Sequence, residues 1–511
     1  MIKIESKSIL HRVEFWIVLF FLIRLVGITQ PPLEIGHNWR QVTGLMVARN
    51  FLEIDPNILY PRVDETQGGT GIIGMEFPSL NYVHFLFSKF FGYEHWYGRL
   101  INLIVSSLGI LYFFKIIRRF FNHKHALASS VILMGSIWFA FSRKMMPDTY
   151  CISLMFIGIY YGITYLDKAK VGHLLLYVFF TSLAVLSKIP AIIYFVLLVP
   201  LWWNTKQMNA KTYFAIATVI PIVFIGWWYF IWNPYLSAAF GNWYNIGKPL
   251  SEGVGEIVSN ITLVLKRFYF NAFSSYFFFV LFLVGLFLFI YQRKRRLIVP
   301  VTMLTIVFVL YIFKSGYFFF HHSYYIIPFV PVMAFVAGYA VSLVKTKVIF
   351  VPILVIGVAE SIANQQHDFF IKETEKYKLS LASIADKVSK KDDLIAISGN
   401  GNPQELYLTN RKGWVYNEDQ LNNEAFVQEI SEKGCAFIFV NRQKTSTELN
   451  EILVFENEFY KVYAINKKEA TSMEAASFFN HLFQDYFLSL SSSTSSKSTS
   501  VTSSSELDSA S

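Results

Sequence analysis

Charged residues are scarce in this chain of 511 residues. Asp, Glu, Lys and Arg make up only 16% of it, whereas 54% is hydrophobic; an average soluble domain is roughly 25% charged. This balance excludes an ordinary soluble protein and predicts one that is largely embedded in a membrane. Cysteine is scarcer still, because only Cys151 and Cys435 occur. Two cysteines exclude a disulfide framework, and Cys151 lies in an apolar run where a buried small side chain is expected.

Several signatures of cofactor binding and catalysis are also missing. The chain has no Walker loop, dinucleotide fingerprint, zinc-protease motif or serine-hydrolase elbow, so nothing indicates a nucleotide substrate or energy source. The net charge of +10 does not indicate a nucleic-acid partner, because the basic residues cluster in short connectors between apolar runs. That distribution is how a membrane protein sets its orientation.

Apolar runs long enough, or nearly long enough, to cross a bilayer dominate the first 364 residues. They lie at about 13–29, 96–117, 124–142, 148–166, 171–187, 189–203, 212–232, 273–291, 297–314, 323–343 and 347–363. If every connector rich in Lys and Arg is cytoplasmic, these eleven spans alternate correctly and the C-terminus lies outside. The segment 78–93 is slightly short and is interpreted as an interfacial or re-entrant helix. If it spans, the count rises within a range of 11 to 13.

The sequence predicts three regions. Residues 1–364 form a helical, polytopic membrane domain with a large first outer loop, 30–78. Residues 365–470 form a small extracytoplasmic α/β domain, because stretches such as LIAIS and AFIFV alternate like strands and EAFVQEISEK is typical of a helix. Residues 471–511 are rich in Ser and should be disordered.

The first outer loop holds unusual polar residues. It begins with a stretch around His37 and Arg40 that is interpreted as an amphipathic helix lying on the membrane surface. Asp64 and Glu65 precede four glycines, and a flexible surface loop explains this pair at least as well as a function does. Glu76 differs, because a carboxylate where the chain re-enters apolar surroundings needs a partner or a role.

Two further segments place charges at the same predicted bilayer face. In SRKMMPDTY, Arg143 and Lys144 end one span and Asp148 begins the next. Asp148 could cap a helix, or the two cations could hold a phosphate while the carboxylate does acid–base chemistry; the two roles are compatible. Lys188, in LSKIPA, could be a snorkelling lysine or a phosphate ligand.

A fourth segment, FFFHHSYYIIPFVP, carries two histidines and two tyrosines at the mouth of a span. Adjacent histidines rarely point the same way, so a two-His metal site is not predicted. One histidine, His321 or its neighbour, could bind phosphate together with Tyr324 or Tyr325. An ordinary aromatic belt also explains the tyrosines.

Over roughly residues 10–360, these segments together resemble the GT-C glycosyltransferases, in the branch of the lipid A aminoarabinose transferases and protein O-mannosyltransferases. MEFPSLNY resembles that branch's E-K-P-P-L-x-Y segment and places Glu76 on its glutamate. MMPDTYCISLMFIGIYY is similar to its P-D-T/P segment and places Asp148 on its acidic residue. LSKIPA is similar to its L-T-K-G-P, and HHSYYIIPFVP to its Y-Y-x-x-P-x-x-P.

The resemblance implies transfer of a sugar, with inversion, from a polyprenyl-phosphate donor to a lipid, glycan or protein acceptor on the outer membrane face. It implies a donor phosphate held by Arg40, Lys144 and Lys188, with His321, Tyr324 and Tyr325 nearby. Glu76 or Asp148 would activate the acceptor. Glu76 is the better candidate for the base, because its apolar neighbours predict a raised pKa, whereas Asp148 has Arg143 and Lys144 close in sequence. No cofactor is required, and a divalent metal stays open.

The chain departs from the family at the acidic pair that usually opens the first outer loop. The pair would fall at Arg40 and Gln41, and neither is acidic. His37 or a displaced carboxylate, with Glu34, Asp64 and Glu65 nearest, replaces it, or the acceptor chemistry differs.

Two rival functions stay open from the sequence alone. One is another outer-face enzyme of lipid-linked glycans, an O-antigen ligase or polymerase. The other is a transporter or flippase for lipid-linked sugars, which would predict ionisable residues within the spans and internal repeats. The expected location is the bacterial cytoplasmic membrane, with a role in cell envelope glycans.

Overall fold

The computed structural model describes residues 9–34, 36–241 and 247–465. It divides into two compact units, a helical unit up to Lys378 and an α/β unit from Leu379 onward. The division lies after the boundary predicted at 364, because the short helices η6 (Gln366–Phe369) and η7 (Glu373–Ser380) follow α18 without starting the sheet. The predicted Ser-rich tail, 471–511, lies outside the described residues.

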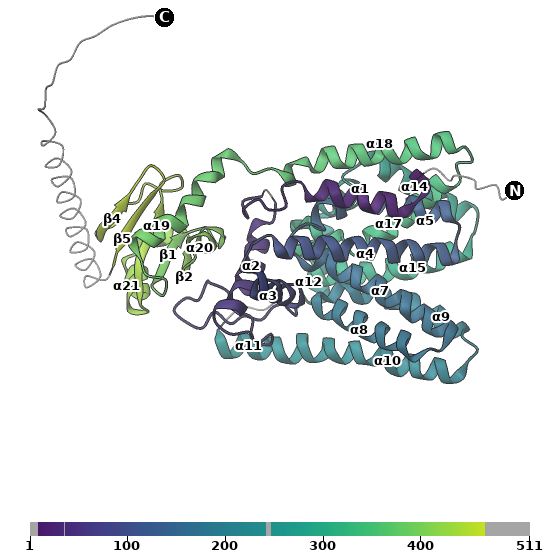
Figure 1. The fold of residues 1–511 in the computed structure, drawn as a ribbon, viewed down its shortest axis with the longest axis horizontal. Coiled ribbons are helices and arrows are strands. Elements are labelled where there is room, and N and C mark those ends of the chain that lie inside the picture. Colours follow the sequence, from purple (N-terminus) through teal and green to yellow (C-terminus); the bar gives the residue numbers. More distant parts are fainter. Residues whose placement is uncertain (1–8, 35, 242–246, 466–511) are drawn as a thin grey trace, which may run out of the picture. The chain divides into compact units, whose positions relative to one another are not determined.

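The helical unit contains eighteen α-helices in the described residues, shown in Figure 1. They are α1 (Val13–Leu25), α2 (Asn38–Glu53), α3 (Ser79–Phe91), α4 (Tyr97–Phe120), α5 (His123–Gly135), α6 (Trp138–Phe141), α7 (Pro147–Lys168), α8 (Val171–Ser187), α9 (Leu198–Asn204), α10 (Met208–Trp227), α11 (Asn233–Phe240), α12 (Leu250–Ser259), α13 (Ile261–Lys266), α14 (Tyr276–Tyr291), α15 (Arg295–Ser315), α16 (Tyr317–His321), α17 (Val330–Ser342) and α18 (Lys347–Gln365). Short 3-10 and π segments join several of them: η1 (Ile9–His11), η2 (Ile189–Leu197), η3 (Trp228–Trp232), η4 (Arg267–Asn271) and η5 (Ser323–Ile326).

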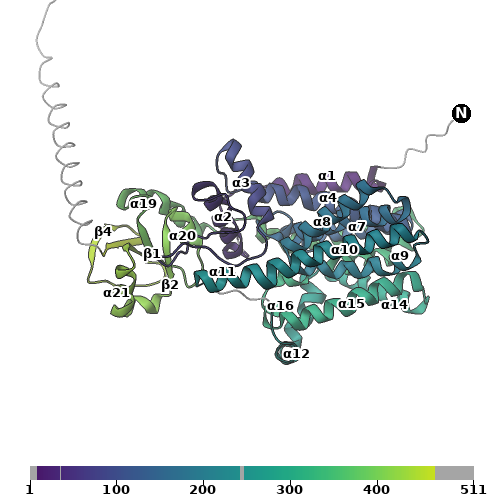
Figure 2. The same cartoon turned by 90° about the horizontal axis from the view of Figure 1, so that it is seen from below.

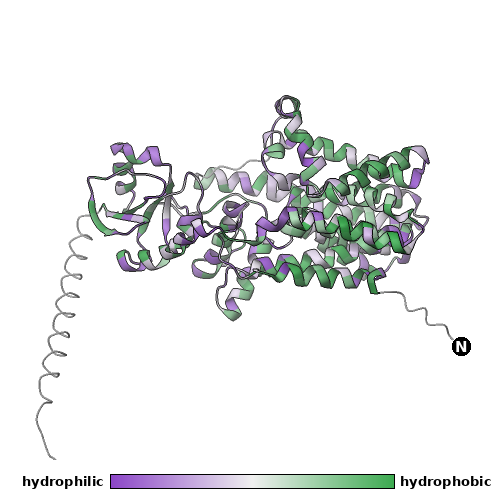
Figure 3. Cartoon of the chain, turned by 90° about the horizontal axis from the view of Figure 1, so that it is seen from above, coloured by the Kyte–Doolittle hydropathy of each residue, from purple (hydrophilic) through white to green (hydrophobic). Residues whose placement is uncertain are grey.

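Each of the eleven predicted apolar runs coincides with one of these helices or with consecutive helices. Five stretches within the described residues are long and apolar enough to cross a membrane unaided: α4, α7, the rod from α10 to α11, α15 and the stretch that begins with α18. Figure 2 shows α10 and α11 as one continuous rod, and Figure 3 shows how hydrophobic the long helices are. The chain is a multi-pass helical membrane protein. The number of eleven spans stays a prediction.

Small residues set the closest helix contacts. A Cβ added at Gly109 of α4 would lie 2.3 Å from Ser153 Cβ on α7, and one at Gly158 of α7 would lie 2.6 Å from Thr181 Cγ2 on α8. Such contacts let helix backbones approach closely where lipid supplies no hydrophobic drive between helices. They place α7, the helix that begins beside Asp148, at the centre of the unit.

The first loop forms a packed structure. The predicted helix is present as α2, and ten of its sixteen residues are buried, so protein encloses most of it; its position at the membrane surface stays a prediction. Arg49 of α2 forms a buried ion pair with Asp64 in the loop that follows, and Asn50 Nδ2 donates to Asp64 Oδ1 at 3.0 Å. Asp64 therefore ties the loop to the helix.

The segment 78–93 is helical as α3 and ends in two exposed side chains, Phe90 and Phe91. Its 13 residues span only ~20 Å at 1.5 Å per residue, which is less than the ~30 Å hydrocarbon core. α3 alone is thus too short to cross a bilayer.

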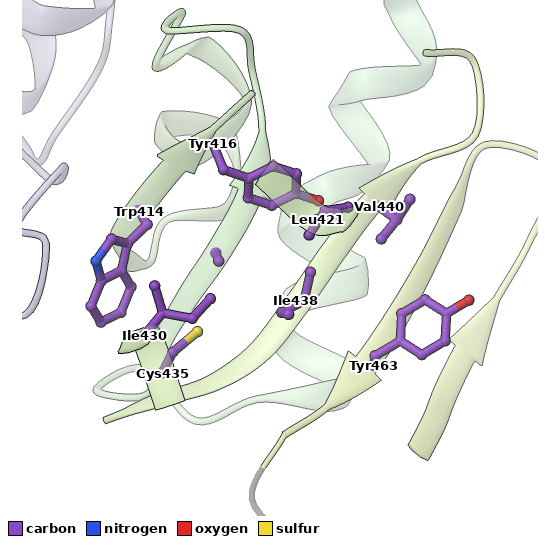
Figure 4. Packing of buried hydrophobic residues seen from close by; sticks show 9 residues of the cluster. Trp414, Tyr416, Leu421, Ile430, Cys435, Ile438, Val440 and Tyr463 are labelled. Carbon is purple, nitrogen blue, oxygen red and sulfur yellow. The ribbon is translucent and has the colours of Figure 1, made fainter. Parts of the chain in front are cut away.

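The α/β unit contains a five-stranded sheet of order β2-β1-β3-β5-β4. Its elements are α19 (Leu381–Val388), β1 (Leu394–Ser398), α20 (Gln404–Thr409), β2 (Lys412–Tyr416), η8 (Glu418–Asn422), α21 (Glu424–Glu432), β3 (Cys435–Asn441), β4 (Ile452–Glu456) and β5 (Tyr460–Ala464). β1 pairs in parallel with β2 and β3, while β5 is antiparallel to β3 and β4. Figure 4 shows the core on one sheet face, where Ile430 of α21 packs with Cys435 and Ile438 of β3.

Candidate active site

The segment that carries Glu76 is fixed by hydrogen bonds to its backbone. The N–H of Met75 donates to Asn233 Oδ1 at 3.3 Å, and the Met75 carbonyl accepts from Asn233 Nδ2 at 2.7 Å and from Trp228 Nε1 at 2.9 Å. The residue after Glu76 donates its N–H to the Leu186 carbonyl at 3.1 Å. Glu76 is therefore held between the end of α8 and the rod of α10 and α11.

Glu76 forms an ion pair with Arg40 in the first turn of α2, and Arg40 Nη2 donates to both carboxylate oxygens. Burial works to raise the pKa of Glu76, but the charges of Arg40 and Lys188 outweigh it and hold the pKa at about 2. The same pairing raises the pKa of Arg40. The raised pKa that apolar surroundings suggest for Glu76 is therefore wrong, because the neighbouring cations stabilise the charged form.

Asp148 lies near the start of α7, but Met146 occupies the N-cap position and no side chain caps the helix there. The capping role considered for Asp148 is therefore wrong. Its Oδ1 lies 2.5 Å from Lys188 Nζ instead, and its buried Oδ2 has no hydrogen-bond partner among the described residues. Lys188 is only 12% exposed at its side chain and lies over the ring of Tyr324, 4.7 Å from its centroid, so it is not a snorkelling lysine.

The two ion pairs form one four-charge cluster, which consists of Arg40, Glu76, Asp148 and Lys188. The charge of Lys188 acts on Glu76, and the charge of Arg40 acts on Asp148. A small cavity of about 20 Å³ beside the cluster is lined by Arg40, Glu76 and Pro147, among others, and has room for about one water molecule.

Lys144 belongs to a separate pair. Its Nζ lies 2.6 Å from Asp368 Oδ1 and donates to the Gly36 carbonyl at 3.2 Å. The side chain is 1% exposed. Lys144 therefore anchors the turn that leads into α2, where sequence reasoning expected a phosphate ligand.

His37 occupies the N-cap position of α2 in a left-handed conformation, with φ of 58°. Its Nε2 lies 3.2 Å from Ser323 Oγ, and its ring centroid lies 4.9 Å from that of Tyr324 and 6.1 Å from that of His322. Burial, reinforced by the charge of Lys144, lowers the pKa of His37 to about 3. Its imidazole is therefore neutral at pH 7 and can act as a hydrogen-bond donor or acceptor.

The structure places His322, rather than His321, against His37. His321 is exposed, stacks on Tyr317 and shares a hydrogen bond of 2.9 Å with its hydroxyl. Burial lowers the pKa of His322 to about 4, with a smaller effect from His321. Tyr325 lies on the cluster side, where Lys188 Nζ is 5.8 Å from its ring centroid.

Arg267 was missed by sequence reasoning. It lies in the π-helical turn η4, its Nη1 donates to Asn271 Oδ1 at 2.9 Å, and its Nη2 donates to the Phe320 carbonyl. Its charge acts on both His37 and His322. No carboxylate pairs with it among the described residues. In the sequence, Arg267 could have been noticed as a cation that lies just before the apolar run at about 273–291.

The carboxylates considered as replacements for the missing acidic pair have other contacts. Glu34 lies between Arg99 and Arg143, and Asp64 pairs with Arg49. Glu65 has its pKa raised by burial, and no contact links it to the four-charge cluster. Within the described residues, no group of three His, Cys, Asp or Glu side chains is placed to hold a metal.

The chain is similar to known proteins in part of its sequence and in its fold. Residues 76–230 match the family model of dolichyl-phosphate-mannose-protein mannosyltransferase, which covers Glu76, Asp148 and Lys188. ArnT from Cupriavidus metallidurans in the apo state is 14% identical, has a TM-score of 0.57 and aligns over 89% of this chain and 98% of its own. The same protein bound to undecaprenyl phosphate is 13% identical over the same shares, with a TM-score of 0.54.

An oligosaccharyltransferase from Archaeoglobus fulgidus is 12% identical, with a TM-score of 0.57 over 83% of this chain and 68% of its own. No curated protein matches the chain by sequence. This is the fold of a GT-C glycosyltransferase. The family-model match, residues 76–230, lies within the part of the chain that shares this fold.

Proposed function

We propose that this GT-C enzyme moves a sugar from a polyprenyl-phosphate donor to an acceptor on the outer membrane face, with inversion at the anomeric carbon. Two structural neighbours support a lipid-phosphate donor: ArnT was solved with undecaprenyl phosphate, and the archaeal oligosaccharyltransferase with dolichol phosphate and an inhibitory peptide. The acceptor is a lipid, a glycan or a protein.

The four-charge cluster is the observation that carries this proposal. Its two cations are each paired with a carboxylate, and Arg267 adds a cation that no carboxylate of the described residues pairs with. A phosphate is a strong hydrogen-bond acceptor that competes for the same cations. When the donor phosphate enters, Lys188 and Arg267 bind it, and Asp148 loses part of its counter-charge.

This exchange couples donor binding to the chemistry. The acceptor oxygen or nitrogen attacks the anomeric carbon from the face opposite the phosphate. The bond from that carbon to the phosphate oxygen breaks, its electron pair stays on the polyprenyl phosphate, and the acceptor proton moves to a base. The negative charge that develops on the leaving phosphate is stabilised by the cations that hold it.

Asp148 is the proposed base. One of its oxygens is held by Lys188, while the other has no partner among the described residues, which leaves a lone pair for the acceptor proton. Glu76 has both oxygens engaged by Arg40 and a pKa of about 2, so it is a weak base and positions Arg40. Neutral His37 is placed to orient the acceptor.

The proposed location is the bacterial cytoplasmic membrane, with the α/β unit outside. Support comes from the basic connectors, which orient the spans in one consistent way. In that orientation the four-charge cluster lies at the outer ends of α7 and α8, where a lipid-anchored donor meets its acceptor.

The test is a transfer assay on membranes that contain the full chain, with a panel of radiolabelled polyprenyl-phosphate sugars. At least one donor should be consumed by the wild type, and Asp148→Asn should consume that donor far more slowly while still binding it. Asp64→Asn is the matched control, because Asp64 is also a buried ion-paired carboxylate but lies outside the cluster. Use of polyprenyl-pyrophosphate oligosaccharides alone would identify a ligase or polymerase and contradict the proposal. Movement of donor across vesicle membranes without transfer would identify a flippase.

A further inference from the structure

Three arginines and one glutamate are buried together outside the proposed active site. Arg24 of α1, Arg99 of α4, Arg143 after α6, and Glu34 in the first loop are each 1% exposed or less. Glu34 Oε1 lies 3.5 Å from Arg99 Nη1 and 3.4 Å from Arg143 Nη2. Arg24 joins the group through Ser142, whose hydroxyl accepts from its Nη1 at 2.5 Å.

The charges of this group do not balance. It holds three guanidinium groups and one carboxylate, so two of its positive charges have no ion-pair partner among the described residues. Lys144 does not change this net charge, because it is paired with Asp368. An arginine keeps its proton under all ordinary conditions, and a buried charge needs a partner. A neutral state of the arginines therefore does not resolve the imbalance.

The hydrogen-bonding atoms do not balance either. Nε and Nη2 of Arg99, and Nε and Nη1 of Arg143, are buried without a partner among the described residues. The other contacts of Arg99 are the Ile28 and Gln30 carbonyls, both to Nη1. Four donor nitrogens on two adjacent cations thus remain to be satisfied. The ring of Phe369 covers one face of Arg143 at 4.1 Å, but it accepts none of these N–H groups.

We propose that Arg99 and Arg143 hold a small inorganic anion of the size of chloride. A halide accepts several N–H donors at once and carries negative charge. It therefore supplies both the missing hydrogen-bond acceptor and the missing counter-charge. The near-complete burial of both side chains favours a small ion over the phosphate of a lipid headgroup. This site is separate from the donor site and does not depend on the proposed reaction.

The anion would act on the shape of the first loop. Glu34 precedes Gly36 by two residues, and the Gly36 carbonyl is held by Lys144, the neighbour of Arg143. Neutralising the arginines therefore stabilises the turn that leads into α2.

The experiment is a thermal unfolding series on the purified full chain in detergent, in sodium chloride or sodium gluconate at equal ionic strength. Chloride should raise the unfolding midpoint in a saturable way, by several degrees, and gluconate should not. Arg143→Gln should abolish the chloride-dependent shift. Arg118→Gln, a matched change at an exposed arginine of α4, should keep it.

Equal midpoints in chloride and gluconate for the wild type would overturn the proposal, as would a full chloride shift in Arg143→Gln. Stabilisation by phosphate and not by chloride would overturn the assignment to a halide. If Arg143→Gln does not fold, bromide-soaked crystals of the wild type decide the question. An anomalous peak between Arg99 and Arg143 is expected, and no peak there contradicts the site.

Discussion

At the scale of single residues, the two carboxylates of the four-charge cluster differ in how fully their oxygens are occupied. We expect Asp148→Asn to lower the transfer rate by about 10²–10⁴-fold, as removal of a general base does, with little change in donor KM. Glu76→Gln leaves Asp148 in place and should lower the transfer rate by on the order of 10-fold. Single-turnover rates with a saturating donor measure the difference. A larger loss in Glu76→Gln would reverse the assignment of the base.

The neutral imidazole of His37 predicts a pH dependence of stability. Its folded pKa is about 3, whereas the unfolded value is 6.5, so below pH 6.5 the unfolded chain binds a proton that the folded chain does not. Stability therefore falls as the pH drops from 6.5 toward 3, with a slope of at most ~1.4 kcal/mol per pH unit from this group.

His37→Gln removes this group and should flatten that part of the stability curve, measured as the unfolding midpoint from pH 7 to pH 4. His321→Gln is the control, because His321 is exposed and should leave the curve unchanged. An unchanged slope in His37→Gln would mean that His37 is protonated in the folded protein.

Sequence reasoning named the residues of the cluster but not their partners. Glu76, Asp148 and Lys188 could be found because each is an ionisable group at the end of an apolar run, which is a local property. The pairing of Lys188 with Asp148 joins residues 40 positions apart, and that of Lys144 with Asp368 joins residues 224 apart. Such choices depend on tertiary packing, so Lys144 was expected at the donor phosphate and Arg267 was overlooked.

At the scale of elements, the two hydrogen bonds between Asn233 of α11 and the backbone of Met75, called the Met75 clamp here, predict that α11 supports the active site without touching substrate. Asn233→Ala leaves the partly buried Met75 N–H without its acceptor, which should destabilise the protein by about 1–3 kcal/mol. It should also lower the transfer rate, because Glu76 and Arg40 are no longer held in place.

The control for the clamp is Asn260→Ala. Asn260 Nδ2 donates to the Glu256 carbonyl at 2.9 Å near the end of α12, at a partly buried position away from Glu76. This change should reduce stability slightly and leave transfer intact. Equal effects of the two substitutions on transfer would show that the clamp has no role in positioning Glu76. Unfolding midpoints and transfer rates on the same preparations give the comparison.

Elements were predicted well where a single property defines them. The apolar runs coincide with helices because hydrophobic length is local, and the strands LIAIS and AFIFV are found as β1 and within β3. The burial of α2 was not predicted, because α3 and the loop 54–78 cover the helix on sides that its sequence pattern leaves undefined. The sequence contains the helix but not the elements that enclose it.

At the scale of the whole molecule, the orientation in the membrane is the open question, and the basic connectors predict it. Fusions that report exposure outside the cytoplasm should be active when placed at Tyr60, Leu250 and Gln420. They should be silent at Phe120, Met208 and Arg295. The physical reason is that Lys and Arg near the ends of spans are retained on the cytoplasmic side. This distribution also places Glu76, Asp148 and Lys188 at outer ends of helices.

The fusion at Gln420 is the decisive one, because an outer position for the α/β unit requires an odd number of spans before it. A cytoplasmic signal there, with the other five sites as expected, would mean that the segment from α15 to α18 crosses the membrane one time more or fewer. The four-charge cluster would keep its outer position in that case, since its residues lie between α2 and the end of α8, before that segment. A cytoplasmic signal at Tyr60 would be more serious. It would place the cluster on the face where basic connectors are expected and would contradict an outer-face transferase.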